Sequence, residues 1–153
     1  MNIDIRPADT IELDLLVELL GEAVTETRLE VEFDREATRD FLWIYMSEAE
    51  AEILVVDADG EIVGWAMLAE AREFFKQPLC YIAKFWVLPG GRRTVAGRDL
   101  LKSVIAWAED RNCTHIFGTA TAGLDKREQQ LFINLMAKQG FFDAGPTLCK
   151  RLE

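Results

Sequence analysis

The sequence predicts a single α/β (α+β) domain, residues 1–153, in which a mixed central sheet is flanked by helices. Its 153 residues are 50% hydrophobic and 29% charged, which is the size and composition of one globular domain. Along the chain, the spacing of apolar residues changes repeatedly between the helical period of about 3.6 and the strand period of about 2. The four prolines lie between these segments and form no linker. The predicted order of elements is β-α-α-β-β-β-α-β-α-β-β.

The N-terminal third predicts one strand and two helices. Residues 2–6 form the strand, because Pro7 has no amide hydrogen to continue its ladder. A capping-box pattern from Asp9 to Glu12 begins a helix with one apolar face, which we expect to end near Gly21. Residues 34–50 predict a second helix that Asp34 caps.

The middle of the chain predicts three antiparallel strands. Residues 53–56 and 62–68 alternate on either side of a turn that ends at Gly60, whose backbone supplies the positive φ of a tight hairpin. Residues 79–88 form the next strand, which ends at Pro89.

The C-terminal third predicts two helices, residues 95–110 and 126–138, with a short strand at 115–119 between them. Gly140 follows the second helix where a left-handed cap is expected. We expect two closing strands, residues 141–142 and 147–152.

Composition excludes several classes of function. Lys and Arg number 17 against 27 Asp and Glu, and the net charge of −10 argues against a nucleic-acid partner. Three cysteines without C-x-x-C spacing and the lone His115 leave a zinc site short of ligands, so no metal is predicted. No apolar run approaches the roughly 18 to 20 residues of a membrane span, and the N-terminus is too polar for a signal peptide. We therefore expect a cytoplasmic protein without a membrane partner.

The charge is unevenly distributed. Residues 1–52 contain 15 acidic residues and 4 arginines, whereas residues 84–102 contain five cationic residues and only Asp99 as an acid. The basic segment follows a predicted strand, contains glycines and leads into a helix. Because the first amides of a helix lack acceptors and that end of its dipole is positive, this arrangement favours a phosphate-bearing ligand. The alternative is a glycine turn followed by a solvated helix end. The Walker and dinucleotide-binding glycine patterns are both absent.

This segment resembles the cofactor loop of the GCN5-related N-acetyltransferase (GNAT) superfamily, V-x-P-x-x-[RQ]-x-x-G-x-[GA]. The matching positions are Val87, Pro89, Arg92, Val95 and Gly97. The resemblance covers nearly the whole element order and implies the acyl-CoA N-acyltransferase fold with acetyl-CoA as cofactor. It also implies main-chain contacts to pantetheine and pyrophosphate from Trp86, Val87, Leu88, Arg92, Arg93, Thr94, Val95, Ala96, Gly97 and Arg98. Val95 departs from the family, which usually has a glycine there, and its bulk is expected at the phosphate.

The catalytic positions of the family are not filled. A family carboxylate on the fourth strand corresponds to Ala83 or Tyr81, and the family's tyrosine acid corresponds to Met136. Strand alternation predicts that Tyr81 shares a face with Ala83, Phe85 and Val87, so its hydroxyl is a candidate catalytic group. The alternative is that Tyr81 is a core aromatic residue.

Two acidic residues of the preceding strand are further candidates. Glu70 and Glu73 are candidates for a base that acts through water, or else they are surface acids.

Two functions remain open at this stage. The first is an N-acetyltransferase that modifies a primary amine of a small cationic molecule or a protein. Glu22, Glu26, Glu30 and Glu32 would attract such a cation, unless they are only the solvated faces of two helices. The alternative is a catalytically degenerate GNAT-fold protein with a structural, virion-assembly or regulatory binding role. An oligomer is possible, but one sequence does not indicate it.

Overall fold

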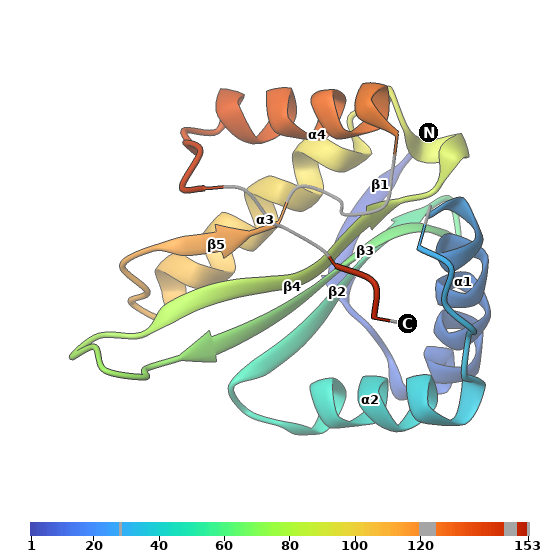
Figure 1. The fold of residues 1–153 in the computed structure, drawn as a ribbon, viewed down its shortest axis with the longest axis horizontal. Helices are drawn as coiled ribbons and strands as arrows, with labels where there is room; N and C mark the ends of the chain where they lie inside the picture. The colour runs from blue at the N-terminus through green and yellow to red at the C-terminus, as the bar shows by residue number, and fades with distance from the viewer. Residues whose placement is uncertain (28, 120–124, 146–149, 153) are drawn as a thin grey trace.

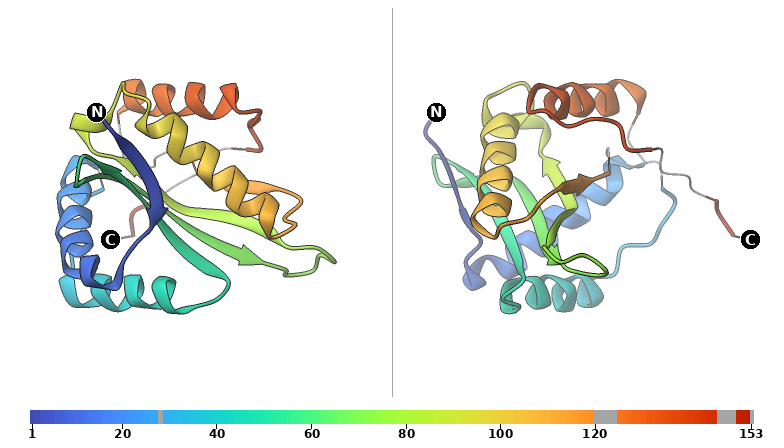
Figure 2. Two further views of the ribbon diagram at one scale, coloured as in Figure 1. Left: turned by 180° about the vertical axis from the view of Figure 1, so that it is seen from behind. Right: turned by 90° about the vertical axis from the view of Figure 1, so that its left-hand side faces the viewer.

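The described part of the chain forms a five-stranded sheet covered by two helices on each face (Figures 1 and 2). The computed structural model describes residues 1–27, 29–119, 125–145 and 150–152. Strands follow the order β1-β2-β3-β4-β5; the first four are antiparallel neighbours and β5 runs parallel to β4. The elements are β1 Ile3–Pro7, η1 Thr10–Glu12, α1 Leu13–Glu26, α2 Arg35–Ser47, β2 Ala51–Ala58, β3 Glu61–Ala71, β4 Leu79–Val87, η2 Pro89–Gly91, α3 Ala96–Asp110, β5 Ile116–Gly118 and α4 Lys126–Lys138.

Each face of the sheet has its own apolar core. On one face, α3 and α4 pack against alternate side chains of the strands, and Leu100 and Val104 of α3 are fully buried there. On the other face, α1 and α2 pack against the remaining side chains of the strands, and Leu16, Leu42 and Trp65 are buried there. The predicted fold class, a mixed sheet flanked by helices, is confirmed.

The predicted capping box is present and joins the first strand to the first helix. The Asp9 carboxylate accepts the Ile11 amide, and the Glu12 carboxylate accepts the Asp9 amide at 2.8 Å. Arg6 donates to both Glu12 oxygens at 2.8 and 2.9 Å and to Asp57 of β2 at 3.1 Å. This bidentate pair fixes the entry to α1 against the sheet.

Helix α1 does not end near Gly21, as predicted, but continues to Glu26. A Cβ at Gly21 would lie 2.9 Å from the Phe33 ring. The glycine therefore allows the segment after α1 to pack closely, and it does not terminate the helix.

The prediction of a strand at residues 141–142 is wrong. Gly140 takes a φ of +89°, and the Phe141 amide then donates to the Met136 carbonyl, which completes the cap of α4. Residue 141 is thus committed to the helix end, and Phe142 is 81% exposed. Of the second closing strand, residues 147–149 lie outside the described residues, and residues 150–152 form no strand.

Strand β4 contains a one-residue bulge at Ala83. Lys84 pairs with Met67 while Ile82 pairs with Leu68, so Ala83 has no partner on β3. The extra residue reverses the direction of every later side chain on the strand. Tyr81 therefore shares a face with Lys84, and the predicted common face of Tyr81, Phe85 and Val87 is wrong.

Strands β4 and β5 stop pairing immediately before the bulge. Strand β5 pairs with β4 only from Cys80 to Ile82. Beyond Ile82, this edge of β4 has no strand partner within the described part of the chain. The main chain along this edge from residue 83 to 87 is therefore available to a ligand, except for the Val87 carbonyl, which accepts a hydrogen bond from Arg92.

The close contact between β3 and β4 gives a test of the packing. A Cβ at Gly64 would lie 2.8 Å from the Trp86 carbonyl oxygen, whereas a Cβ at Gly90 would meet nothing within 4 Å. We expect Gly64→Ala to lower the free energy of unfolding by about 2 kcal/mol, because backbone must move, and Gly90→Ala to change it by less than about 0.5 kcal/mol. Urea denaturation of both variants measures the difference; equal stabilities would contradict the packing of these strands.

Candidate functional site

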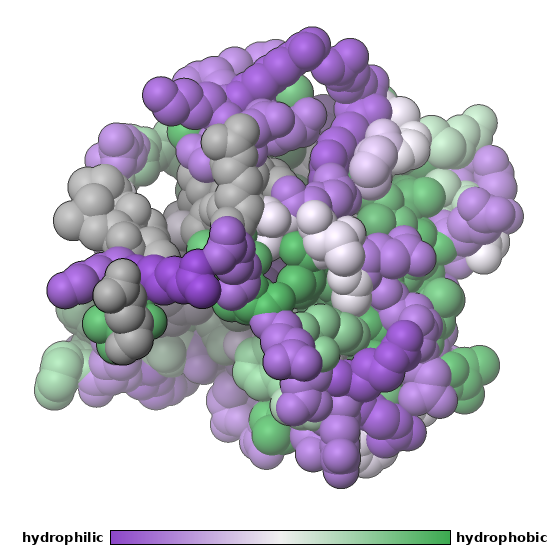
Figure 3. Space-filling view, turned by 45° about the vertical axis from the view of Figure 1, so that its right-hand side comes forward, coloured by the Kyte–Doolittle hydropathy of each residue, from purple (hydrophilic) through white to green (hydrophobic). Residues whose placement is uncertain are grey.

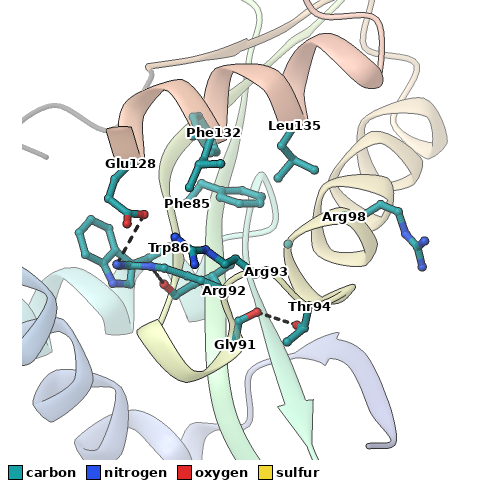
Figure 4. Close-up of a pocket in the computed structure, with 13 residues that line it drawn as sticks. Phe85, Trp86, Gly91, Arg92, Arg93, Thr94, Arg98, Glu128, Phe132 and Leu135 are labelled. Carbon is teal, nitrogen blue, oxygen red and sulfur yellow. Dashed lines mark hydrogen bonds and ion pairs between the residues drawn. The ribbon is translucent and has the colours of Figure 1, made fainter. Parts of the chain in front are cut away.

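A pocket of about 250 Å³ lies between the end of β4, the loop after it and α4 (Figure 4). Phe132 and Leu135 of α4 point toward Phe85 of β4, and the two phenylalanine rings lie 5.1 Å apart between centroids. Apolar side chains also gather in the middle of the molecular face in Figure 3, and polar residues surround them. The lining residues are Phe85, Trp86, Val87, Gly91, Arg92, Arg93, Thr94, Gly97, Arg98, Glu128, Leu131, Phe132 and Leu135.

The loop that enters α3 leaves its amides available. Within the described residues, the amides of Arg93, Thr94, Val95, Gly97 and Arg98 donate no hydrogen bond, and only the Ala96 amide is used, by the Thr94 hydroxyl at 3.1 Å. The Thr94 hydroxyl in turn donates to the Gly91 carbonyl at 2.6 Å. This side chain fixes the loop without consuming the other donors. Free amides at the positive end of a 15-residue helix favour an anion.

Two glycines make room along the pocket wall. A Cβ at Gly97 would lie 3.4 Å from Leu135, and one at Gly91 would lie 3.0 Å from a Val87 methyl group. Val95 is 44% exposed and is not among the lining residues. The Val95 side chain, whose bulk was expected at the phosphate, therefore does not line the pocket.

Arg92 is held by the protein on several sides. Its Nε donates to the Val87 carbonyl at 2.7 Å, and its terminal nitrogens lie 2.9 Å from Glu26 and 3.8 Å from Glu128. The guanidinium also lies over the Trp86 ring at 5.4 Å. Two carboxylates thus compensate a charge that the sequence assigned to a ligand. Arg92 links the loop to the end of α1 and the start of α4.

The other two arginines differ in their partners. Arg98 pairs with Asp99 at 2.9 Å and points away from the other labelled pocket residues (Figure 4). Arg93 lines the pocket and has no ion-pair partner among the described residues. Its φ of +63° is unusual for a residue with a side chain, and strain of this kind is common at ligand sites. Arg93 is therefore the cation that remains available to an anion.

The catalytic candidates lie apart from one another. The Tyr81 hydroxyl donates to the Glu73 carboxylate at 3.2 Å. Partial desolvation, then the charge and hydrogen bond of Glu73, raise the pKa of Tyr81 above its ordinary value, so the hydroxyl stays protonated at neutral pH. Glu70 lies on the opposite face, where it is 13% exposed and pairs with Arg72 at 3.5 Å and Arg111 at 3.8 Å. The structure does not bring Glu70 to Tyr81 or to the pocket.

Other reactive groups carry no site. Burial raises the pKa of the Cys80 thiol to about 12, which suppresses the thiolate. The described residues include no cluster of three His, Cys, Asp or Glu that would suit a metal ion. Within the same residues, no helix is both long and apolar enough to cross a membrane.

The family model "Acetyltransferase (GNAT) family" matches residues 14–141. The chain belongs to the GNAT family of acetyltransferases. Membership identifies acetyl-CoA as the cofactor. The free amides and the unpaired Arg93 fit its diphosphate. The pocket wall at Gly91 and Gly97 fits its extended arm. The resemblance inferred from the loop motif is confirmed.

Individual relatives agree with this membership. The chain is 31% identical over 78 residues to an aminoglycoside N(6')-acetyltransferase type 1 of Klebsiella aerogenes, a match that covers 49% of this chain and 51% of the relative. It therefore spans about half the length of that protein.

Solved structures share the fold at low identity. The aminoglycoside acetyltransferase AAC(6')-Iy, in complex with the bisubstrate analogue CoA-S-monomethyl-acetylneamine, has a TM-score of 0.77 at 17% identity, with 100% of this chain and 99% of that chain covered. A predicted acetyltransferase of Clostridium acetobutylicum, solved with acetyl-CoA, has a TM-score of 0.78 at 18% identity, with 98% and 96% covered.

Several features of this GNAT site were missed from the sequence. Glu26 and Glu128 are far from Arg92 along the chain, and no local pattern pairs them. The apolar wall from α4 had a signal, because Leu131 and Phe132 lie four and three positions before Leu135, on one helix face. Met136, at the position of the family's tyrosine acid, is buried in the core.

The free Arg93 gives a prediction of cofactor affinity. We expect Arg93→Gly to weaken CoA binding by about 1 kcal/mol or more, since a charge is lost at the diphosphate. The same change should alter the free energy of unfolding by less than about 1 kcal/mol, because relief of the left-handed strain offsets the added chain entropy. Titration calorimetry and urea denaturation measure the two effects. Arg93→Lys, which keeps the charge, is the control, and equal affinity in both variants would contradict the role.

The ion pairs of Arg92 predict a contribution of this residue to the free energy of unfolding. Arg92→Gln leaves Glu26 and Glu128 unpaired in a half-buried place, and we expect the free energy of unfolding to fall by about 1–2 kcal/mol. Adding Glu26→Gln should recover part of this loss in a double-mutant cycle. Arg98→Gln, at an exposed pair between neighbours, is the control with an expected change below about 0.5 kcal/mol. Additive losses would show that the Arg92–Glu26 pair is not coupled.

Proposed function

We propose that this GNAT protein is an acetyl-CoA-dependent N-acetyltransferase whose acceptor is a primary amine on a small cationic molecule. The observation that carries the proposal is the loop before α3, which combines free amides with the unpaired Arg93 beside an apolar pocket and an open strand edge. Backbone donors without a protein partner beside a pocket are available to the acceptor atoms of a ligand.

Each part of the site suits one part of the cofactor. The free amides of residues 93–95, 97 and 98, with the Arg93 side chain, would hold the diphosphate. The exposed main chain of residues 83–87 would pair with the amides of the pantetheine arm. The apolar side chains of β4 and α4, among them Phe85 and Phe132, would pack along that arm and exclude water.

Tyr81 is the chain's best candidate for a proton donor. Acetyl-CoA supplies an acetyl thioester, and transfer to an amine forms one N–C bond, breaks one C–S bond and moves one proton from nitrogen to sulfur. The raised pKa of Tyr81 keeps its proton available at neutral pH. The neighbouring Glu73 carboxylate orients the hydroxyl and is a proton acceptor in its own right.

The acceptor class is supported by charge and by the named relatives. The net charge of −10 favours a cationic substrate by long-range attraction. Among the acids of the first third, Glu26 pairs with Arg92 and Glu30 pairs with Arg151, so they do not act as free charges. The relatives modify aminoglycosides, which are small molecules with several amines.

The test is acetylation of an amine panel, followed by mass spectrometry. We expect acetyl-CoA-dependent products with aminoglycosides such as neamine and no products with DNA or RNA. Tyr81→Phe should lower kcat at least about tenfold, because the proton donor is lost, without changing acetyl-CoA affinity.

Two further variants control for the cofactor site. Gly97→Leu would fill the pocket and abolish turnover, whereas Lys102→Leu, on the exposed side of the same helix, would not. Absence of every acetylated amine, despite tight acetyl-CoA binding, would favour the degenerate binding module instead.

A further inference from the structure

A row of four side chains crosses the sheet on the face opposite the cofactor pocket. Ala51 pairs with Ala69, Ala69 with Tyr81, and Tyr81 with Phe117, so the row passes over β2, β3, β4 and β5. Two of its members, Ala51 and Ala69, carry only a methyl group. Tyr81 is half-buried and Phe117 is 40% exposed, so this end of the face is open to solvent.

Three rings at this end lie nearly parallel. Tyr81 and Phe117 stack with centroids 5.6 Å apart at an interplanar angle of 24°, and His115 follows Phe117 at 6.2 Å and 26°. We call His115, Phe117 and Tyr81 the aromatic shelf. The ring surface that these residues leave exposed can contact the apolar face of a ligand ring or a cation.

An acidic residue contacts Tyr81, and a basic residue follows it on the same face of β4. Glu73 accepts the Tyr81 hydroxyl at 3.2 Å and is itself exposed, on the turn that projects from one end of the sheet (Figure 1). Its φ of +40° is strained for a residue with a side chain, which is a second sign of a functional position. On the same face, beyond the bulge at Ala83, lies the exposed Lys84.

We propose that the aromatic shelf binds the acceptor, and that the acceptor is a ring carrying at least two amines. One amine, as an ammonium, pairs with Glu73 while the ring lies on Tyr81 and Phe117. A second amine then points toward Ala83, where the open edge of β4 begins. The positive charge of Lys84 disfavours protonation there and leaves that amine able to act as a nucleophile. This inference rests on the proposed acetyltransferase function.

Binding of three probes tests the substrate class without turnover. Neamine carries several amines on rings, glucosamine carries one amine on a ring, and spermidine carries several amines without a ring. We expect neamine to bind the protein at least about tenfold more tightly than either of the others in titration calorimetry, with and without CoA. Equal affinity for neamine and spermidine would overturn the role of the rings, and equal affinity for neamine and glucosamine would overturn the second amine.

Variants test the residues themselves. Glu73→Gln and Phe117→Ala should each weaken neamine binding, and raise its KM, about tenfold or more, with the KM of acetyl-CoA unchanged. Glu61→Gln, an exposed acid on β3, and Phe74→Ala, an exposed ring on the same turn as Glu73, are matched controls. The conservative changes Glu73→Asp and Phe117→Tyr should restore most of the affinity, which excludes misfolding as the cause.

The outcomes separate this inference from the proposed function. If the wild-type protein acetylates amines but both shelf variants bind neamine normally, the shelf is wrong and the acetyltransferase assignment stands. If no amine is acetylated, the assignment fails. In that case normal neamine binding by the variants would also overturn the shelf.

Discussion

The single extra residue at Ala83 is the constraint on which the functional geometry depends. It reverses the side chains of β4, so that Phe85 and Val87 turn toward α3 and α4 while Tyr81 remains on the other face. The same region is where β5 stops pairing with β4. A regular strand would keep Phe85 and Tyr81 on one face. In the function proposed above, the bulge therefore separates the side of the sheet that binds the cofactor from the side that binds the acceptor.

The loop before α3 depends on a second constraint, the placement of Arg92. A loop with unpaired amides is costly to order, because it gives up main-chain freedom without gaining hydrogen bonds. Arg92 offsets part of that cost through the Val87 carbonyl, Glu26 and Glu128, which come from three different elements. Thr94 completes the arrangement from within the loop. The donors that face the pocket are thus held in position by groups outside it.

The sequence was informative wherever the signal is local. Helix α4 begins and ends at the predicted residues, and the Asp9 capping box is present as expected, because periodicity and caps depend on neighbours in the chain. The loop proposed to bind the cofactor was predicted in the same way, from strand, glycine and helix signals in succession.

Failures occurred where distant segments decide the structure. Nothing near Ala83 indicates a bulge, since the register of β4 is set by β3. A glycine often marks the end of a helix, but Gly21 lies inside α1, where it makes room for the Phe33 ring. For the same reason Arg92 seemed available to a ligand, although two distant carboxylates hold it.

The unpaired edge of β4 has a consequence for how this protein diverges from its relatives. An edge offers peptide groups, which every amino acid except proline possesses in full, so substitutions along residues 83–87 need not alter what the strand presents. The ring and charged side chains on the opposite face have no such tolerance, because each substitution there changes the chemical group that is presented.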